Sequence, residues 1–298
     1  MLLKDFIHES VAVLGEVYAE KEAESLVHML CEGLLGVKSY THIIEPGFEV
    51  PGKSGSALKS AMDRLLGGEP VQYILGYADF RELRFRVTPA VLIPRPETEL
   101  LVDEAVAAAS RLVRIRSSFA GHEAPVRVLD LCTGSGCIAW SLALEVPGVE
   151  VVATDISEEA LEVAASQPFD AIVRKRKAIA PRFVRSDVLD MEQGFPYGMF
   201  DIVLSNPPYI MEGQKTEMSR NVLDFEPHQA LFVPDDDPLV FYRAVSAWAD
   251  RELVPGGMGL VEINEDLGRE TQDVFSSFRE CRTLKDFYGK DRLVSFMK

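Results

Sequence analysis

An asparagine, two prolines and a tyrosine follow an apolar run in "FDIVLSNPPYI", at residues 200–210. Proline holds the residue before it in extended geometry, and its own nitrogen cannot donate a hydrogen bond. The Asn206 side-chain oxygen and the Pro207 carbonyl can therefore each accept one hydrogen from a planar –NH2 group, while Tyr209 offers an apolar face. The alternative interpretation is a merely rigid loop.

Two aligned acceptors of this kind favour one reaction in particular. An amide or aryl amine nitrogen is a poor nucleophile because its lone pair is delocalised, and the acceptors stabilise the pyramidal, increasingly positive nitrogen that forms during in-line attack on a methyl sulfonium. A general base is not required, because the proton becomes acidic once the methyl group has transferred. We therefore predict methyl transfer to an –NH2 group, with Asn206, Pro207, Pro208 and Tyr209 as the catalytic residues.

A glycine-containing turn in "VLDLCTGSGCIAWSLA" separates an apolar run from a helical one. Gly134, Gly136 and Ala139 fit the pattern G-x-G-x-x-A, which lets a nucleotide-like ligand approach the backbone at a helix N-terminus. About 20 residues later Asp155 ends the next apolar run, where a carboxylate can accept both ribose hydroxyls. Together the two features predict a site for a ligand that contains a nucleoside.

Two further carboxylates follow strands of the same predicted sheet. Asp130 precedes the glycine turn, where it would repel a pyrophosphate and suits a positively charged ligand such as S-adenosylmethionine; a turn-stabilising acceptor is an equally weighted alternative. Asp187 could accept the exocyclic amine of an adenine, or it could cap a helix. Ligands of open α/β sheets bind outside the carboxyl ends of the strands, where both residues fall with Asp155 and Asn206.

The elements that must position these residues can be read from hydrophobic spacing. From residue 126 onward, short apolar runs alternate with helical stretches, which predicts an α/β fold with a parallel sheet, helices on both faces and an antiparallel edge formed by the last two runs. The first third of the chain has helical spacing and predicts a small helical domain. Next, "YILGYADFRELRFRVTPAVLIP" predicts a connecting β-hairpin, and a new helix is expected near Pro96.

Composition narrows the class of protein further. The chain has 298 residues, 47% of them hydrophobic, and a formal net charge of −16. A negative protein is poorly suited to bind nucleic acid through phosphate contacts. Apolar runs fall short of the roughly 20 residues of a membrane helix, and we recognise no signal peptide. The four cysteines form no C-x-x-C pair, so we expect reduced thiols in a cytoplasmic protein and no metal site.

The chain resembles the family of release-factor glutamine methyltransferases, which transfer a methyl group from S-adenosylmethionine to the side-chain amide nitrogen of the glutamine in the Gly-Gly-Gln loop of peptide chain release factors. The likeness spans nearly the whole chain and rests on "GGEPVQYILGYADF", "VTPAVLIPRPETELLV", "DLCTGSGCIA", "ATDISEEALEVA", "SNPPYI", "FEPHQALF" and "FYGKDRLV". The motif "NPPY" alone is shared with methyltransferases that act on nucleobase amines. "IPRPETE" combined with a helical N-terminal domain is much more specific.

The resemblance implies a seven-stranded, Rossmann-like class I methyltransferase sheet. It also implies a helical substrate-recognition domain at 1–73, a β-hairpin linker at 74–93 and a methyltransferase domain at 94–298. S-adenosylmethionine would be the methyl donor, S-adenosylhomocysteine the product, and release factors the partners, with neither a membrane nor direct nucleic acid binding expected. The residues expected at the donor are Asp130, Cys132, Thr133, Gly134, Ser135, Gly136, Asp155, Ile156, Asp187, Val188 and Asn206. The residues expected at the substrate are Arg95, Pro96, Glu97, Asn206, Pro207, Pro208 and Tyr209.

The sequence departs from the family pattern in a few places. Cys132 replaces the glycine of the usual "DLGTGSG", "FVPDDDPL" replaces a glycine-rich stretch, and "EINEDLG" differs after the fifth strand. These departures affect local loop geometry, whereas every residue of the predicted –NH2 clamp is present. Glu226, in "FEP", also matches the family and is expected to have a structural role.

Three rival functions remain open from the sequence. The first is a methyltransferase for the exocyclic amine of adenine or guanine in DNA or RNA, which would use the same clamp but is disfavoured by the negative charge. The second is an inactive binding module that keeps the fold. The third is a nicotinamide-dependent dehydrogenase, which the carboxylate at Asp130 disfavours.

Overall fold

The computed structural model describes residues 1–118 and 124–298; residues 119–123, inside the expected methyltransferase domain, lie outside the described part. The chain divides into two compact units, the first formed by Met1–Tyr77 with Met218–Phe225, the second by Ala78–Glu217 with Glu226–Lys298. We describe each unit by itself. No helix in the described ranges has the length and apolar character needed to cross a membrane.

The first unit is helical, as its apolar spacing predicts. Its helices are α1 (Leu3–Leu14), α2 (Glu20–Leu35), α3 (Thr41–Ile44), α4 (Gly55–Leu66) and α5 (Val71–Leu75), with a 3-10 turn at Gly52–Ser54 and the separate segment α10 (Arg220–Phe225). Leu14, Val27, Leu30 and Leu58 are fully buried in one shared core. Burial of this apolar stripe stabilises the unit, because isolated helices of this length are marginal in water.

The predicted β-hairpin is present but shorter than expected. Its strands are β1 (Tyr77–Phe80) and β2 (Leu83–Arg86), and the first residues of the predicted hairpin segment, Tyr73–Leu75, belong instead to helix α5 (Val71–Leu75). Gly76 explains the boundary, because its φ of 77° lies in the left-handed region that ends helices and that glycine adopts without strain. After β2, the chain from 87 to 97 runs as a loop and turns to helix α6 (Thr98–Ser117), close to the start expected near Pro96.

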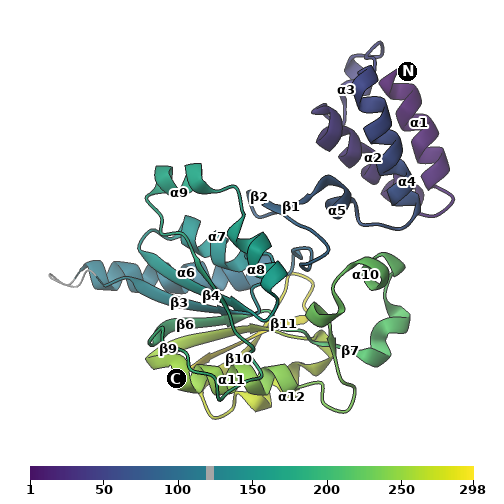
Figure 1. Ribbon diagram of the computed structural model, residues 1–298. Coiled ribbons are helices and arrows are strands. Elements are labelled where there is room, and N and C mark those ends of the chain that lie inside the picture. The colour runs from purple at the N-terminus through teal and green to yellow at the C-terminus, as the bar shows by residue number, and fades with distance from the viewer. Residues whose placement is uncertain (119–123) are drawn as a thin grey trace. The chain divides into compact units, whose positions relative to one another are not determined.

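A seven-stranded sheet forms the centre of the second unit (Figure 1), as predicted. The strand order is β10 (Arg279–Lys285), β11 (Asp291–Met297), β9 (Leu253–Glu262), β6 (Phe200–Ser205), β3 (Val126–Leu131), β4 (Val149–Asp155) and β5 (Arg182–Arg185). The five strands from β9 to β5 are parallel, and β11 runs antiparallel to both β9 and β10. The last two strands are therefore the antiparallel edge that the sequence predicts.

Helices cover both faces of the sheet, and the strand residues alternate between two cores. Ile202 and Leu204 of β6 face α6, α7 (Cys137–Glu145) and the region of α9 (Asp170–Arg176), whereas Val203 faces α11 (Val240–Glu252) and α12 (Gly268–Val274). Helix α8 (Glu158–Ala165) follows β4. A strand buried on both faces reads as a continuous apolar run, which is why "FDIVL" lacks alternation. A small pair, β7 (Ile210–Met211) and β8 (Phe232–Val233), and 3-10 turns at Glu212–Glu217, His228–Ala230 and Glu265–Leu267 complete this unit.

One glycine of the sheet has no room for a side chain. Gly259 of β9 lies opposite Phe296 of β11, and a Cβ atom added at Gly259 would lie 2.0 Å from that ring. The ring cannot move aside easily because it is fully buried and stacks on Phe275 at a centroid distance of 4.5 Å. We expect Gly259→Ala to lower the free energy of unfolding by about 2–3 kcal/mol in a urea titration. Gly47→Ala, where an added Cβ meets nothing within 4 Å, is the matched control, and equal midpoints for the two variants would contradict this account.

Candidate active site

A cavity opens at the carboxyl edge of the sheet, where β3, β4 and β6 end, and most of the predicted site residues line it. The lining includes Arg95, Cys132, Thr133, Gly134, Ser135, Asp155, Ile156, Asp187, Val188, Asn206 and Pro208. They come from segments more than 100 residues apart in the chain. Parallel strands bring them together because their carboxyl ends meet at one edge.

Other predicted residues do not line this cavity. Asp130 lies beneath the glycine turn, Gly136 forms the start of α7, and Pro96 and Glu97 precede α6. Pro207 and Tyr209 are also absent from the lining. Within "NPPY" the first and third residues line the cavity, and the second and fourth do not.

The glycine turn is held to the end of β4 by Asp155. One oxygen of this carboxylate accepts the Gly134 N–H at 2.9 Å and the other accepts the Ser157 N–H at 3.0 Å. Gly134 and Gly136 have φ values of 54° and 78°. A Cβ at Gly134 would meet nothing within 4 Å, and its position on the cavity wall leaves the backbone open to a ligand, whereas at Gly136 it would crowd Ala164 at 3.1 Å. The first glycine therefore opens the turn, and the second lets α7 pack closely.

Cys132 occupies a backbone position that suits glycine better. Its φ is 62°, in the left-handed region that costs an ordinary residue about 1–2 kcal/mol. This conformation explains why glycine is usual there in the family, and it shows that the turn keeps its geometry with a cysteine in place. Burial raises the pKa of the Cys132 thiol, so the side chain stays neutral beside the cavity.

Asp130 is completely buried, and one of its carboxylate oxygens has no hydrogen-bond partner in the described part of the chain. The Thr133 hydroxyl donates to its Oδ2 at 2.6 Å, while its Oδ1 has no hydrogen-bond partner among the described residues. Burial raises the pKa of Asp130 to about 7; hydrogen bonding by Thr133 opposes this shift, and the nearby charge of Asp155 adds to it. Of the two interpretations of Asp130, the structure displays the turn-stabilising contact, made to a side chain rather than to backbone N–H groups.

Asn206 is oriented by a residue that sequence reasoning missed. Its side-chain nitrogen donates to the Thr98 hydroxyl at 3.2 Å, across 108 positions of the chain. The amide oxygen of Asn206 consequently remains available as an acceptor at the cavity wall, which both residues line. Thr98 belongs to "PETE" at the start of α6; that motif drew attention to Arg95–Glu97, but nothing in the sequence pairs its threonine with Asn206.

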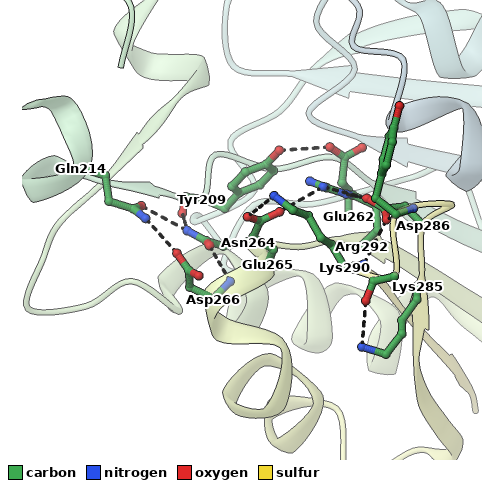
Figure 2. A network of polar contacts seen from close by, with 12 residues as sticks. Tyr209, Gln214, Glu262, Asn264, Glu265, Asp266, Lys285, Asp286, Lys290 and Arg292 are labelled. Atoms are coloured by element: carbon green, nitrogen blue, oxygen red, sulfur yellow. Dashed lines mark hydrogen bonds and ion pairs between the residues drawn. The ribbon is translucent and has the colours of Figure 1, made fainter. Parts of the chain in front are cut away.

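Behind the loop, Tyr209 is held by the end of β9 (Figure 2). Its hydroxyl donates to Glu262 Oε1 at 3.1 Å, and its carbonyl accepts from Asn264 Nδ2 at 3.0 Å. Burial raises the pKa of Tyr209 well above its usual range, so the phenol remains a donor. Glu262 and Asn264 were not predicted, although polar residues at the end of a buried strand, in "GLVEIN", are a usable signal.

Glu262 is the buried acid behind this site. The residue is 1% exposed, and burial raises its pKa, while hydrogen bonding from Tyr209 and the nearby Thr98 hydroxyl act in the opposite direction. Thr98 thus stands between Glu262 and Asn206, and Tyr209 contacts the same acid. Glu262 therefore holds the Tyr209 end of the "NPPY" loop, and Thr98 holds the Asn206 end.

A buried ion pair fixes the loop that carries Arg95. Glu226 Oε1 accepts from Arg95 Nη2 at 2.6 Å, and its Oε2 accepts the Ile93 N–H at 3.2 Å. The Glu226 side chain is 1% exposed, so each of its oxygens has a partner that offsets the cost of burial. These contacts are the structural role that the motif "FEP" suggested, and they hold Arg95 at the cavity wall.

Comparison with known proteins defines first the class of this fold and then its family. Residues 110–225 match the family model described as "Methyltransferase small domain", and residues 5–76 match "PrmC N-terminal domain". The fold is that of a methyltransferase. The release factor glutamine methyltransferase of Bacteroides thetaiotaomicron is 40% identical over 288 residues, which cover 95% of each chain. That of Flavobacterium psychrophilum is 34% identical over 296 residues, covering 99% of this chain and 98% of the relative.

This protein belongs to the family of release factor glutamine methyltransferases. Among solved structures, the release-factor-specific protein-(glutamine-N5) methyltransferase of Alicyclobacillus acidocaldarius is 28% identical, and the match covers 72% of this chain and 99% of that chain with a TM-score of 0.40.

Proposed function

We propose that this protein transfers a methyl group from S-adenosylmethionine to the side-chain amide nitrogen of the glutamine in the Gly-Gly-Gln loop of peptide chain release factors. The observation that carries the proposal is the contact between Asn206 Nδ2 and Thr98, which leaves the Asn206 oxygen facing the cavity as an acceptor. Membership of the family supports the choice of substrate. The negative net charge of −16 disfavours the rival function on nucleic acid.

The donor side of the cavity suits S-adenosylmethionine. The open backbone at Gly134 leaves space that a side chain would fill, and Asp155 stands at the end of β4, where a carboxylate can accept ribose hydroxyls. Asp187 and Val188 line the same cavity, and we assign them to the adenine. Asp130 is buried beneath the glycine turn and does not line the cavity; with its pKa raised to about 7 it is partly ionised at neutral pH, and the ionised form favours a cationic ligand nearby. When bound, S-adenosylmethionine supplies an electrophilic methyl group on a positively charged sulfur.

The acceptor side activates a weak nucleophile by orientation. We assign one hydrogen of the glutamine –NH2 group to the Asn206 oxygen and the other to the Pro207 carbonyl of the same loop, although Pro207 is not part of the cavity lining. The two acceptors direct the nitrogen lone pair toward the methyl carbon. As the N–C bond forms, the C–S bond breaks and its electron pair stays on sulfur. The acceptors stabilise the positive charge that grows on nitrogen, and the proton then leaves to solvent. Tyr209 and Thr98 hold these acceptors in place through their contacts with Glu262 and Asn206.

We assign recognition of the release factor to residues 1–73, linkage to 74–93 and methyl transfer to 94–298. The match of residues 5–76 to "PrmC N-terminal domain" supports the first assignment. A cytoplasmic location and the absence of direct membrane or nucleic acid binding belong to the same proposal, because release factors act in translation.

Transfer of labelled methyl groups tests the function directly. The protein and labelled S-adenosylmethionine are incubated with an unmodified release factor, with a copy whose loop glutamine is changed to alanine, and with duplex DNA. We expect label on the first substrate alone. Label on the DNA with none on the release factor would establish the rival substrate, and label on both release factors would place the modification at another residue.

A further inference from the structure

The tip of the β10–β11 hairpin exposes two adjacent aromatic side chains. Phe287 is 100% exposed and Tyr288 is 82% exposed. The two rings contact each other edge to face, with centroids 6.0 Å apart. Two large apolar residues side by side in water are unfavourable for an isolated protein, and aromatic residues of this kind are enriched where proteins bind one another.

The turn that carries them is held by many hydrogen bonds. Asp286 Oδ1 accepts the N–H groups of Tyr288 at 2.9 Å and Lys290 at 3.0 Å, and the Asp286 N–H donates to the Lys290 carbonyl at 2.9 Å. Gly289, with a φ of 80°, allows the reversal. The exposed rings are therefore presented by an ordered turn, so that binding through them would not require ordering of the backbone.

Strand direction places this tip at the same edge of the sheet as the candidate active site. Strand β11 is antiparallel to both β9 and β10, so β10 runs in the direction of β9 and ends at the carboxyl edge, where the tip begins. Along that edge, the glycine turn and Asp155 follow β3 and β4, Asn206 follows β6, and the hairpin tip lies on the opposite side of β6.

The base of the hairpin also contacts the residues that support the acceptor loop (Figure 2). Arg292 donates to Asp286 Oδ2 at 3.0 Å and to Glu265 at 3.2 Å, and its carbonyl accepts the N–H of Ile263, the residue after Glu262. Leu293 pairs directly with Glu262 across the two strands. The base of the hairpin is thus linked to Glu262, the carboxylate that binds Tyr209, through Leu293 and through the contact of Arg292 with Ile263.

We propose that Phe287 and Tyr288 dock the folded substrate protein beside the loop that presents its glutamine. The proposal rests on the proposed function. In the proposed function, the donor lies over β3 and β4 and the glutamine lies at β6. The polypeptide that flanks the glutamine can then lie along the part of the sheet edge formed by β9, β11 and β10. The occupant is the release factor itself, through an apolar surface next to its glutamine loop that covers both rings.

A double variant tests this docking surface. F287A/Y288A is compared with the parent protein on two substrates, the intact unmethylated release factor and a short peptide that contains only the glutamine loop. We expect KM for the intact release factor to rise about 30-fold or more, as for aromatic residues that dominate an interface, with kcat unchanged. The values of kcat/KM on the peptide and the Kd for S-adenosylmethionine should stay within about twofold of the parent, because neither ring lines the cavity.

Ile115→Ala is the matched control. Ile115 is also an exposed apolar residue, 48% accessible, but its neighbour Arg116 contacts Asp201 near the start of β6, so it lies at the opposite edge of the sheet. The control should leave KM for both substrates unchanged. An unchanged KM of the double variant on the intact release factor, or an equal rise for the peptide, would overturn the docking surface. Parent protein that methylates neither substrate would instead reject the proposed function.

Discussion

Asn206→Ala should lower kcat for methyl transfer by on the order of 10³-fold, the loss expected when a group that stabilises the transition state is removed. The Asn206 oxygen is the acceptor left free by the contact with Thr98, and alanine offers no substitute. The Kd for S-adenosylmethionine should change only a few-fold, because the donor is held mainly by the residues after β3 and β4. Steady-state kinetics with labelled donor gives kcat, and calorimetric titration gives the Kd.

Thr98→Val provides a graded comparison for this result. Valine has nearly the same shape but cannot accept a hydrogen bond from Asn206 Nδ2. The acceptor oxygen of Asn206 therefore remains, but the orientation of the amide group is no longer fixed. We expect a loss of about tenfold, well short of that of Asn206→Ala. A kcat for Asn206→Ala close to that of the parent would reject the clamp mechanism. A kcat for Thr98→Val equal to that of the parent would contradict the orienting role assigned to Thr98.

Asp130→Asn should change how stability depends on pH. Burial raises the pKa of Asp130 to about 7 in the folded protein, against 3.8 for the exposed group. Between these values the folded state binds more protons than the unfolded state, so the free energy of unfolding falls as the pH rises from about 4 to 7. Above pH 7 the cost of the buried charge is complete and amounts to roughly 4 kcal/mol. Asparagine does not titrate, and the variant should lose this dependence.

Urea titrations at pH 5 and pH 8, without donor, measure the effect. The difference in unfolding free energy between variant and parent should shift in favour of the asparagine variant by up to roughly 2.7 kcal/mol from the lower to the higher pH, because about two pH units separate pH 5 from the pKa of about 7. A constant offset between the two proteins reflects packing and hydrogen bonding alone, so only the change with pH is diagnostic. Parallel curves for the two proteins would contradict a titrating Asp130.

Local chemistry explains why much of the site could be predicted from the sequence. Proline restrains its neighbours through contacts within two residues, so the backbone geometry of "NPPY" is set largely by the motif itself. The glycine turn and Asp155 belong to one strand–helix–strand unit. The spacing between them follows from the length of a helix that packs across the sheet. The expectation that these residues meet needed only the rule that the carboxyl ends of parallel strands lie at one edge of the sheet.

The predictions that needed correction concern the chain near residues 71–76. "VQYIL" has residues suited to either a helix or a strand, and the preference is decided by packing: Val71 and Tyr73 are buried, and Gly76 ends the helix before the hairpin starts. The direction of the Tyr209 side chain likewise depends on the tertiary structure. It points to Glu262 and away from the cavity, because the end of β9 offers a buried acceptor.

By itself, the sequence determined the α/β class, the strands and the methyltransferase family, and it predicted the residues that we assign to the –NH2 group, because periodicity, glycine and proline act over short distances. Only the tertiary structure decided which polar groups meet. Thr98 contacts Asn206 across 108 positions, Tyr209 contacts Glu262 across 53, and Asp130 is buried with one oxygen that has no hydrogen-bond partner in the described part of the chain. Such pairings depend on strand order and on burial, which result from the packing of the whole sheet and which no local pattern records.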